Sequence, residues 1–408
     1  MIYDRFISQR LKRRLQRPFV DIVFGARQTG KTFLLQRLLE PALTYNLADP
    51  AEHARLAADP GAFRRECEAL PETGNVKVVF VDEAQLLPSI FDSVQVLYDI
   101  APDRWKFVLC GSSARKLRSA GANLLPGRAV LHHLHPLVIP ERTTPENPSS
   151  AGYILPLDWQ SANPFPEAPL EHRLAYGDLP GIARLEPEDK QVVLSSYADI
   201  HLHEEIRREG LVRDWGAFIN FLRLAAAESG NTLNYSKLST EVGVSVPTIK
   251  SHYQLLEDMF VGFSVRAFSG SPRKNLLSTP RFLFFDIGVR HAAAGITPGP
   301  DAVAADPGGI FEQWVGAELY RRLAYLKKGK LSYLRTKSGA EIDYIVELED
   351  RLLPIEVKWT SRPTLKDTRH LSKFIEEQPR AKDGFIICRC PRPQKMSKQI
   401  YAIPWHML

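Results

Sequence analysis

The sequence predicts an α/β protein of more than one domain, with an α/β unit at each end and a helical part between them. The chain has 408 residues, and at about 150 residues per domain two or three domains are expected. From about residue 18 to 138, short β-rich runs alternate with helical stretches, and β-rich runs return from about residue 275. Between about 170 and 265, apolar residues instead recur at helical spacing.

Composition excludes several classes of protein. Hydrophobic residues make up 44% and charged residues 25% of the chain, which excludes a disordered chain, a collagen and a coiled-coil rod. The four cysteines lack the spacing of a zinc site or a disulfide scaffold, so a cytoplasmic protein is expected. The basic N-terminus is unlike a signal peptide, and no apolar run is long enough for a membrane helix. We expect no membrane partner, whereas a net charge of +6 permits binding to nucleic acid.

A phosphate-binding loop opens the first domain, which we predict over residues 1–140. The segment matches G-x-x-x-x-G-K-[ST], follows a predicted strand at Val20–Phe24 and precedes a predicted helix at Phe33–Leu39. Glycines let the backbone curl so that N–H groups point at phosphate oxygens, and the helix adds its positive N-terminal end. We expect ATP here, with Lys31 on the terminal phosphates and Thr32 on Mg²⁺. The predicted nucleotide contacts are Gly25, Ala26, Arg27, Gln28, Thr29, Gly30, Lys31 and Thr32.

Two further strand ends in this domain supply polar side chains. The apolar run Val78–Val81 leads into Asp82 and Glu83. At a strand end, Asp82 can hold Mg²⁺ through water, and Glu83 can orient or deprotonate the attacking water. The predicted strand Phe107–Cys110 ends in Ser112–Ser113, and one of these hydroxyls could contact the terminal phosphate or hold the attacking water. For Asp82 and Glu83, the structural alternative is an ordinary strand followed by a solvated acidic turn.

A family resemblance rests on the order of these motifs. The order GARQTGKT, VVFVDEAQ, LCGSSARKL and LLPGRAVLHHLHPL, over roughly residues 18–140, resembles the AAA-type ATPases of bacteria and archaea. The most similar subgroup carries a C-terminal domain of unknown function. The resemblance implies ATP hydrolysis, with Asp82 and Glu83 as the acidic pair and Ser112 or Ser113 as the sensor. It implies that Arg128 is an arginine finger, although a plain surface arginine is the alternative. Because a neighbouring subunit often supplies the finger, a homo-oligomer is also implied.

The middle of the chain predicts a linker and then a helical, winged-helix-like domain. Prolines are dense in residues 141–169, which we predict to be the linker. Within residues 170–270, two predicted helices, Asn234–Val242 and Pro247–Leu256, are separated by a glycine turn and a serine cap. This is the helix-turn-helix pattern, used either for DNA binding or for packing and oligomer contacts. Side chains that could face a DNA groove are Thr248, Lys250, Ser251 and His252.

A charged hairpin marks the last domain, predicted over residues 275–408 as a second α/β unit. Glu341–Glu347 and Pro354–Lys358 are predicted strands joined by a polar turn, and a helix is predicted upstream at Ile310–Leu326. The hairpin would bring an aspartate beside an E-x-K pair, which matches the PD-(D/E)xK pattern of restriction-endonuclease-like folds. A solvated charged hairpin is the alternative.

The chemistry of this pattern explains its residue types. Asp343 and Glu356 would bind Mg²⁺ with a helix glutamate, either Glu312 or Glu318, and the metal would polarise the scissile phosphate. Lys358 would stabilise the developing charge or position the nucleophile. Nearby basic residues that could contact a phosphate backbone are Lys327, Lys328, Lys330, Arg335 and Lys337.

Residues 280–380 also resemble the domain of unknown function that follows the ATPase in the same proteins. The similar stretches are FFDIGVRHAAAG, GGIFEQWVGAELYRRL, LSYLRTKSGAEIDYIV and LLPIEVKWT, and the resemblance implies nuclease-like roles for Glu312, Asp343, Glu356 and Lys358. Our leading hypothesis is an ATP-hydrolysing protein that acts on DNA and contains a Mg²⁺-dependent nuclease-like domain. The alternative is an ATP-dependent regulatory or scaffold protein whose inert nuclease-like domain binds a protein partner.

Overall fold

The computed structural model describes residues 3–72, 74–113, 127–142, 168–208, 210, 212–269, 278–336 and 339–408. These residues form two compact units. The first consists of residues 4–135 with the short segment 258–260, and the second mainly of residues 136–257 and 261–408. No helix in the described ranges is both long and apolar enough to cross a membrane.

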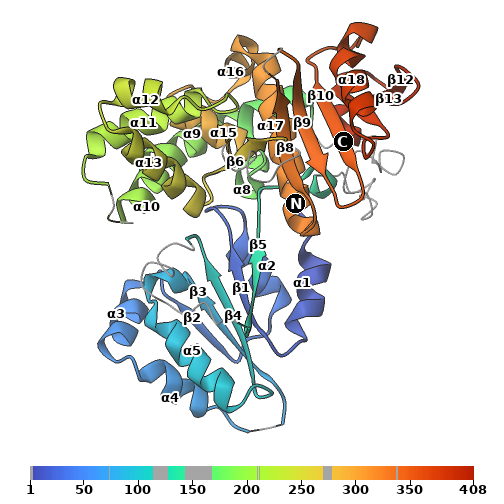
Figure 1. Ribbon diagram of the computed structural model, residues 1–408. Helices are drawn as coiled ribbons and strands as arrows, with labels where there is room; N and C mark the ends of the chain where they lie inside the picture. The colour runs from blue at the N-terminus through green and yellow to red at the C-terminus, as the bar shows by residue number, and fades with distance from the viewer. Residues whose placement is uncertain are drawn as a thin grey trace. The chain divides into compact units, whose positions relative to one another are not determined.

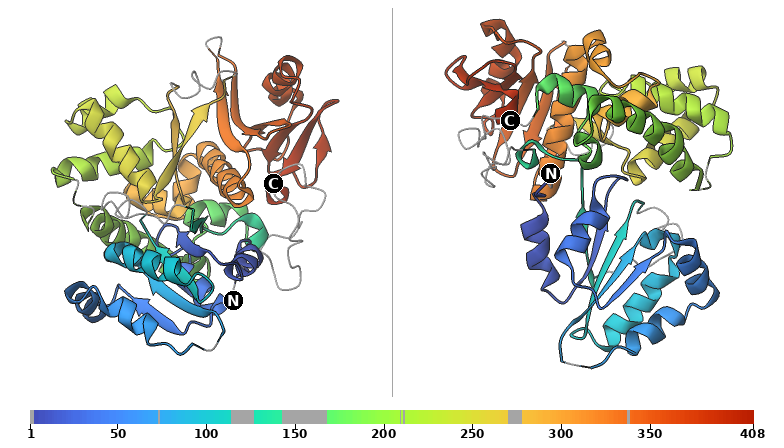
Figure 2. Two further views of the ribbon diagram at one scale, coloured as in Figure 1. Left: turned by 60° about the horizontal axis from the view of Figure 1, so that its bottom comes forward. Right: turned by 180° about the vertical axis from the view of Figure 1, so that it is seen from behind.

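The first unit is a five-stranded parallel sheet in the order β2-β3-β4-β1-β5, with helices on both faces (Figures 1 and 2). All its strands end at the same edge, so the loops that follow them gather there. The predicted α/β architecture with a parallel sheet is confirmed. The strands are β1 Val20–Phe24, β2 Leu43–Asn46, β3 Lys77–Asp82, β4 Trp105–Gly111 and β5 Ala129–His133, and the helices are α1 Ser8–Leu15, α2 Lys31–Leu38, α3 Pro50–Ala58, α4 Ala62–Glu68 and α5 Ser89–Ile100.

Helices make up the first part of the second unit. Asn234 caps α12 by accepting from the Lys237 N–H, and Gly243 ends that helix with a positive φ of 78°. The Ser245 hydroxyl accepts from the Thr248 N–H at the start of α13. The two predicted helices and their turn are therefore present, while the winged-helix assignment stays a prediction. The helices are α7 Leu170–Tyr176, α8 Pro180–Ala183, α9 Pro187–Ser196, α10 His203–Arg208, α11 Trp215–Ala227, α12 Tyr235–Val242 and α13 Val246–Asp258.

An eight-stranded sheet in the order β12-β13-β11-β10-β9-β8-β6-β7 forms the rest of the second unit. β6 and β7 stand on either side of the domain boundary predicted near residues 270–275, and they pair with each other; residues 270–277 themselves lie outside the described ranges. The long helix α17 packs against this sheet. The strands are β6 Gly262–Ala267, β7 Arg281–Phe284, β8 Lys330–Arg335, β9 Glu341–Glu347, β10 Leu352–Val357, β11 Gly384–Cys388, β12 Gln394–Lys395 and β13 Ile400–Pro404, and the helices are α15 Ile287–Ala293, α16 Pro300–Ala305, α17 Pro307–Leu326 and α18 Arg369–Glu377.

A buried charge cluster holds the start of the second unit. The Asp178 carboxylate accepts from Arg142 at 2.8 Å, from Arg321 at 3.3 Å and from the Trp314 indole N–H at 2.8 Å. Burial opposes its charge, but the surrounding guanidiniums lower the pKa of Asp178 below its usual value. The Leu137 N–H also donates to the Asp178 carbonyl at 2.8 Å. Residues 136–142 therefore belong to this unit, and most of the predicted linker, residues 143–167, lies outside the described ranges.

Candidate nucleotide site and acidic cluster

The predicted phosphate-binding loop curls tightly between β1 and α2. A Cβ at Gly25 would stand 2.2 Å from the Leu134 carbonyl oxygen, so only glycine fits there. Gln28 and Gly30 both adopt positive φ, of 60° and 87°. These are left-handed conformations, and alternation of this kind turns successive N–H groups toward one concavity. Arg27, which directly precedes Gln28 in the loop, is half-buried.

Side chains hold this loop from inside and from outside. The Lys31 ammonium donates to the Gly25 and Ala26 carbonyls, both at 2.9 Å. The Thr29 hydroxyl donates to the Ala26 carbonyl at 2.8 Å. Arg5, which sequence reasoning missed, donates to the Thr29 carbonyl at 2.6 Å. Because no motif marks Arg5, which lies 24 residues away, its role emerges only from the folded chain.

The predicted Mg²⁺ residues lie together at the carboxyl edge of the parallel sheet. The Thr32 hydroxyl donates to Asp82 Oδ2 at 2.8 Å, joining the start of α2 to the end of β3. Asp82 is nearly buried, at 8% exposure, and its Oδ1 accepts from the Glu83 N–H at 3.0 Å. A hydroxyl and a carboxylate are the oxygen ligands that Mg²⁺ prefers.

Glu83 is held in a strained conformation beside this pair. Its φ is 52°, which is uncommon for a residue with a Cβ, and strained residues cluster at functional sites. Its carboxylate accepts from the Gln85 amide and from the Ser112 hydroxyl, the latter at 3.3 Å, and the same amide donates to Ser112 Oγ at 3.0 Å. The neighbouring Ser113 hydroxyl is buried and has no hydrogen-bond partner among the described residues. Sequence reasoning missed Gln85, although it stands two residues after Glu83.

Arg128 lies at the other edge of the same sheet. The Val20 N–H, at the start of β1, donates to the Arg128 carbonyl at 3.0 Å. Four residues of strand, about 13 Å, separate this point from Phe24 at the loop end. The Arg128 side chain pairs with Asp99 of α5. The structure therefore does not bring Arg128 to the phosphate-binding loop of its own unit.

The second predicted site lies on the hairpin β9–β10. Their register pairs Ile355 with Tyr344 and thus sets Glu356 opposite Asp343. Asp343 Oδ2 accepts from the Val357 N–H at 2.7 Å, and Glu356 Oε1 accepts from the Lys358 ammonium at 2.6 Å. Glu356 Oε2 is buried and has no partner among the described residues. The predicted juxtaposition of Asp343, Glu356 and Lys358 is present.

Between the two candidate helix glutamates, Glu312 is the one near Asp343. Burial and the Asp343 charge raise the pKa of Glu312 to about 7. Burial and the same aspartate raise the pKa of Glu356 to about 7. Glu318 is instead fully buried in another contact, where it accepts from the Ile139 N–H at 2.8 Å and from Arg322 at 2.6 Å.

Two cations of the chain form ion pairs with members of this acidic cluster, which we define as Glu312, Asp343 and Glu356. Lys358 pairs with Glu356. Arg281, which sequence reasoning missed, pairs with Glu312 at 2.7 Å and with Glu341. Across the described ranges, no three His, Cys, Asp or Glu side chains converge closely enough to hold a metal ion. The cluster is therefore arranged around Arg281 and Lys358 rather than around a ready metal cage.

The prediction that His252 of the helix-turn-helix could face a DNA groove is wrong. His252 is 9% exposed and packs edge-on against Phe218, with ring centroids 4.8 Å apart. Burial lowers its pKa. Lys250 and Ser251 are exposed, and the Lys250 ammonium lies over the Tyr235 ring at 5.3 Å. His252 thus belongs to the core and cannot face a groove.

Three family models match consecutive parts of the chain. Residues 17–143 match an AAA domain, which supports an AAA-type ATPase. Residues 167–299 match a domain of unknown function, DUF8612, and residues 307–408 match another, DUF4143. A domain of unknown function therefore follows the AAA domain, as the resemblance implied, while the restriction-endonuclease-like assignment stays a prediction.

Relatives match over most of the chain. The chain is 27% identical over 369 residues to an uncharacterized protein of Mycobacterium tuberculosis and, equally, to one of Mycobacterium bovis, covering 90% of this chain and 76% of each relative. An uncharacterized protein of Haemophilus influenzae is 23% identical over an alignment of 371 residues, which covers 86% of this chain and 86% of the relative. A solved DNA polymerase III gamma subunit-related protein of Thermotoga maritima aligns at 13% identity with a TM-score of 0.24, covering 62% of this chain and 97% of its own. A TM-score this low supports no comparison of folds.

Proposed function

We propose that the protein binds and hydrolyses ATP with Mg²⁺ and uses this cycle to act on nucleic acid. The observation that carries the ATPase part is the bond between the Thr32 hydroxyl and Asp82 Oδ2, at 2.8 Å, beside the buried Lys31 ammonium. The AAA domain match over residues 17–143 supports the same conclusion. An assay of ATP hydrolysis with and without DNA, on one preparation, tests both parts of the proposal. Loss of the DNA effect alone leaves the ATPase part standing.

Each residue of the loop edge has a role in this proposal. Lys31, which donates to loop carbonyls in the structure, would donate to the terminal phosphates. Thr32 and Asp82 would hold Mg²⁺, whose charge offsets that of the phosphates. Glu83 would orient the attacking water and accept its proton. The Ser113 hydroxyl, which has no hydrogen-bond partner within the described ranges, suits a contact to the terminal phosphate.

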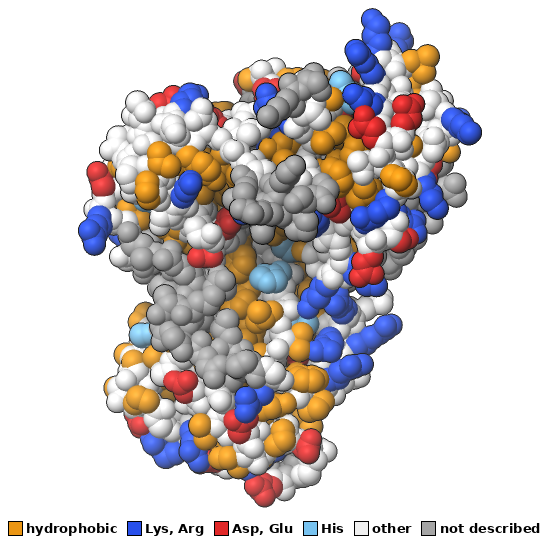
Figure 3. Space-filling view, in the orientation of Figure 1, with side chains coloured by type: hydrophobic (Ala, Val, Ile, Leu, Met, Phe, Trp, Pro, Cys, Tyr) orange, Lys and Arg blue, Asp and Glu red, His pale blue; other side chains and the backbone are white. Residues whose placement is uncertain are grey.

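A basic helix supports nucleic acid as the partner. α1 contains four basic residues in eight and no acidic residue. Only Leu11 of this helix is buried, and Arg10, Lys12 and Arg13 are exposed. Figure 3 shows Lys and Arg side chains gathered over α1. A surface of this kind attracts a phosphate backbone and releases its counterions.

Removing two charges from α1 is expected to weaken DNA binding. Lys12→Ala with Arg13→Ala should lower affinity for a 20-base-pair duplex and reduce the slope of log K against log salt by about 1–2. Fluorescence anisotropy over a salt series measures this. The matched control is Arg64→Ala with Arg65→Ala on α4, since these arginines already pair with Glu68 and Asp59. Equal losses in the two double variants would contradict a role for α1.

The nuclease-like part of the proposal is supported by topology and opposed by charge pairing. The predicted context is a helix, a hairpin and a second helix. In the structure, α17 is followed by the antiparallel strands β8, β9 and β10, then by α18, and then by β11, which runs parallel to β10. This order agrees with the predicted context. The pairing of Lys358 with Glu356 and of Arg281 with Glu312 specifically favours the alternative, an inert domain that binds a protein partner. Metal binding separates the two.

If the acidic cluster is a metal site, Mn²⁺ should bind weakly to the full chain and Asp343→Ala should remove that binding. The physical reason is that a divalent cation offsets two carboxylates better than one ammonium does. Calorimetric titration without nucleotide measures it. Asp350→Ala removes a solvent-exposed acid from the turn of the same hairpin and is the matched control. Identical titrations of wild type and Asp343→Ala would favour the scaffold alternative.

Arg128 can serve as a finger only for a nucleotide bound by another subunit. Arg128→Ala and Lys31→Ala chains should each be inactive, and a mixture should regain partial ATP hydrolysis because each chain supplies what the other lacks. Turnover of the mixture, in a preparation shown to contain mixed oligomers, is the measurement. If the mixture regained no ATP hydrolysis, Arg128 would be only a surface residue that pairs with Asp99.

A further inference from the structure

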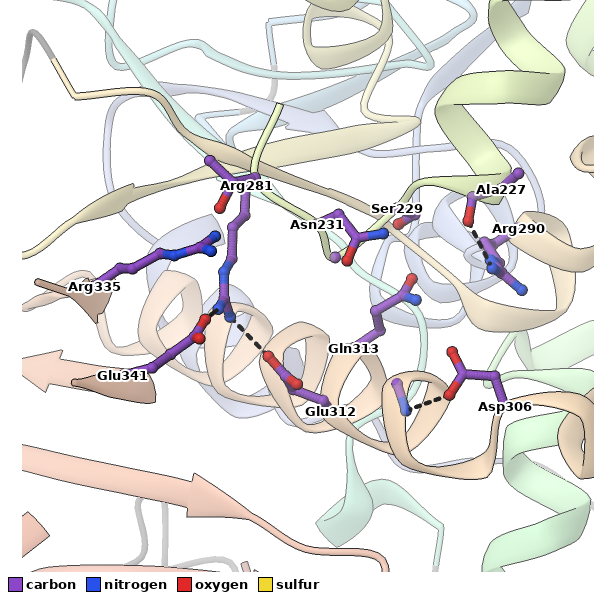
Figure 4. Close-up of a pocket in the computed structure, with 13 residues that line it drawn as sticks. Ala227, Ser229, Asn231, Arg281, Arg290, Asp306, Glu312, Gln313, Arg335 and Glu341 are labelled. Atoms are coloured by element: carbon purple, nitrogen blue, oxygen red, sulfur yellow. Dashed lines mark hydrogen bonds and ion pairs between the residues drawn. The ribbon is translucent and has the colours of Figure 1, made fainter. Parts of the chain in front are cut away.

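A polar cavity of about 190 Å³ lies in the second unit, beside the acidic cluster. Its walls come from the turn after α11, from the first residue of β7, from the first turns of α17 and from the facing ends of β8 and β9 (Figure 4). The register Arg335–Glu341 sets those two strand ends opposite each other. The side chains used below are Thr232, Arg281, Glu312, Gln313, Arg335 and Glu341.

Three arginines line this cavity, and one of them, Arg290, already donates to the Ala226 and Ala227 carbonyls. Arg281 is 5% exposed, lies over the Tyr333 ring at 4.5 Å and is oriented by its ion pairs with Glu312 and Glu341. Its Nε is buried and has no acceptor among the described residues. Arg335 is exposed and makes no ion pair within the described ranges, and its side chain reaches toward that of Arg281 in Figure 4. Glu312 and Glu341 also line the cavity and already accept from the two terminal nitrogens of Arg281. Among the described residues, Arg281 Nε and the Arg335 guanidinium are therefore donors that no carboxylate occupies.

The opposite wall offers neutral hydrogen-bonding groups. Gln313 is 5% exposed, and its Oε1 is buried without a partner among the described residues, as is Thr232 Oγ1. Gly230, with a φ of 90°, leaves room for this amide, because a Cβ there would stand 2.7 Å from Gln313 Cγ. Figure 4 shows the amides of Asn231 and Gln313 facing each other. An amide oxygen only accepts hydrogen bonds, so it requires a ligand with a hydroxyl or amino donor.

We propose that the cavity binds a nucleotide through its phosphate monoester, with the phosphate between Arg281 and Arg335 and a sugar or base donor at Gln313. The Arg335 guanidinium and the Arg281 Nε, which has no acceptor among the described residues, would donate to the phosphate oxygens. The neutral wall suits the sugar or base. This inference rests on the proposed action on nucleic acid, and the group recognised would be a terminal phosphate monoester. The same chemistry has two sources, a free mononucleotide and the phosphorylated 5′ end of a strand.

Binding of short labelled oligonucleotides to the full chain tests this. The probes are a single-stranded hexadeoxynucleotide with a 5′-phosphate and the same strand without it, in fluorescence anisotropy with EDTA so that no cleavage occurs. We expect the phosphorylated strand to bind about 10-fold or more tightly than the other, a difference that Arg335→Ala should abolish. Gln313→Leu should weaken both probes. Arg351→Ala, at the far turn of the same hairpin, removes an equal charge and should change neither.

Competition by AMP distinguishes a free mononucleotide from a strand end as the ligand. An assay of ATP hydrolysis distinguishes failure of this inference from failure of the proposed ATPase function. Displacement of the phosphorylated strand by AMP identifies a free mononucleotide as sufficient, whereas failure of AMP to compete identifies a strand end. Either result supports the cavity as a site if Arg335→Ala abolishes the phosphate preference. Absence of any phosphate preference in wild type, or equal losses in Arg335→Ala and Arg351→Ala, overturns the inference. If the same wild-type preparation still hydrolyses ATP, the ATPase proposal survives that failure.

Discussion

Lys31→Ala is expected to reduce ATP hydrolysis by about 100-fold or more, with a matching loss of ATP binding. The ammonium is the positive group that the loop directs at the phosphates, and removing one positioned donor to developing charge typically costs about this much. The fold should persist, because the loop keeps two other anchors, the bond from Arg5 to the Thr29 carbonyl and the bond from the Thr29 hydroxyl to the Ala26 carbonyl. Steady-state turnover and titration with a fluorescent ATP analogue measure the two effects.

A second variant makes the Lys31 result specific. Arg37→Ala removes a positive charge from the exposed side of the same helix and should leave turnover within about twofold of wild type. Thermal unfolding by circular dichroism shows that both variants are folded. Undiminished hydrolysis in Lys31→Ala would refute the phosphate-binding assignment of the loop.

Glu83→Gln is expected to retain ATP and to slow its hydrolysis by about 100-fold to 10,000-fold, the range for removal of a general base. The amide has nearly the shape of the carboxylate and can still accept from Ser112, so the strained turn should be preserved. It is, however, a poor base. Single-turnover hydrolysis with ATP prebound separates chemistry from binding.

The comparison for Glu83 uses an exposed acid of the same unit. Glu68→Gln, on the surface of α4 and paired with Arg64, should hydrolyse ATP at the wild-type rate. If Glu83→Gln instead lost ATP binding and kept normal turnover of the ATP that does bind, Glu83 would be a structural residue of the turn.

Local signals in the sequence predict the elements of the first site well. β1 begins and ends where the sequence predicts a strand, at Val20 and Phe24, because four of its five residues are apolar and suit a strand buried on both faces. The loop geometry follows from Gly25, Gly30 and Lys31 within eight residues. The contact between Thr32 and Asp82 is also foreseeable, since parallel strands bring their carboxyl ends to one edge.

The second site is only partly predictable, because its decisive contacts join residues distant in sequence. The hairpin register sets Asp343 near Glu356, as the predicted pairing of the two strands indicates. No local sequence pattern predicts that Arg281 pairs with Glu312 and Glu341, which lie 31 and 60 residues away. His252 shows the converse error, since a histidine on a short helix gives no sign that two phenylalanines of α11 will enclose it.

The cluster around Asp178 determines where the chain can be divided for separate expression. A fragment starting at residue 170, where the helical part was predicted to begin, would lack Arg142 and the Leu137 backbone that bonds to residue 178 and to Arg321. Removing one partner from a buried ion pair typically costs about 3–5 kcal/mol, a large share of the stability of an ordinary domain. Soluble expression of the C-terminal part alone therefore requires a start at or before residue 136, several residues inside the stretch that matches the AAA domain.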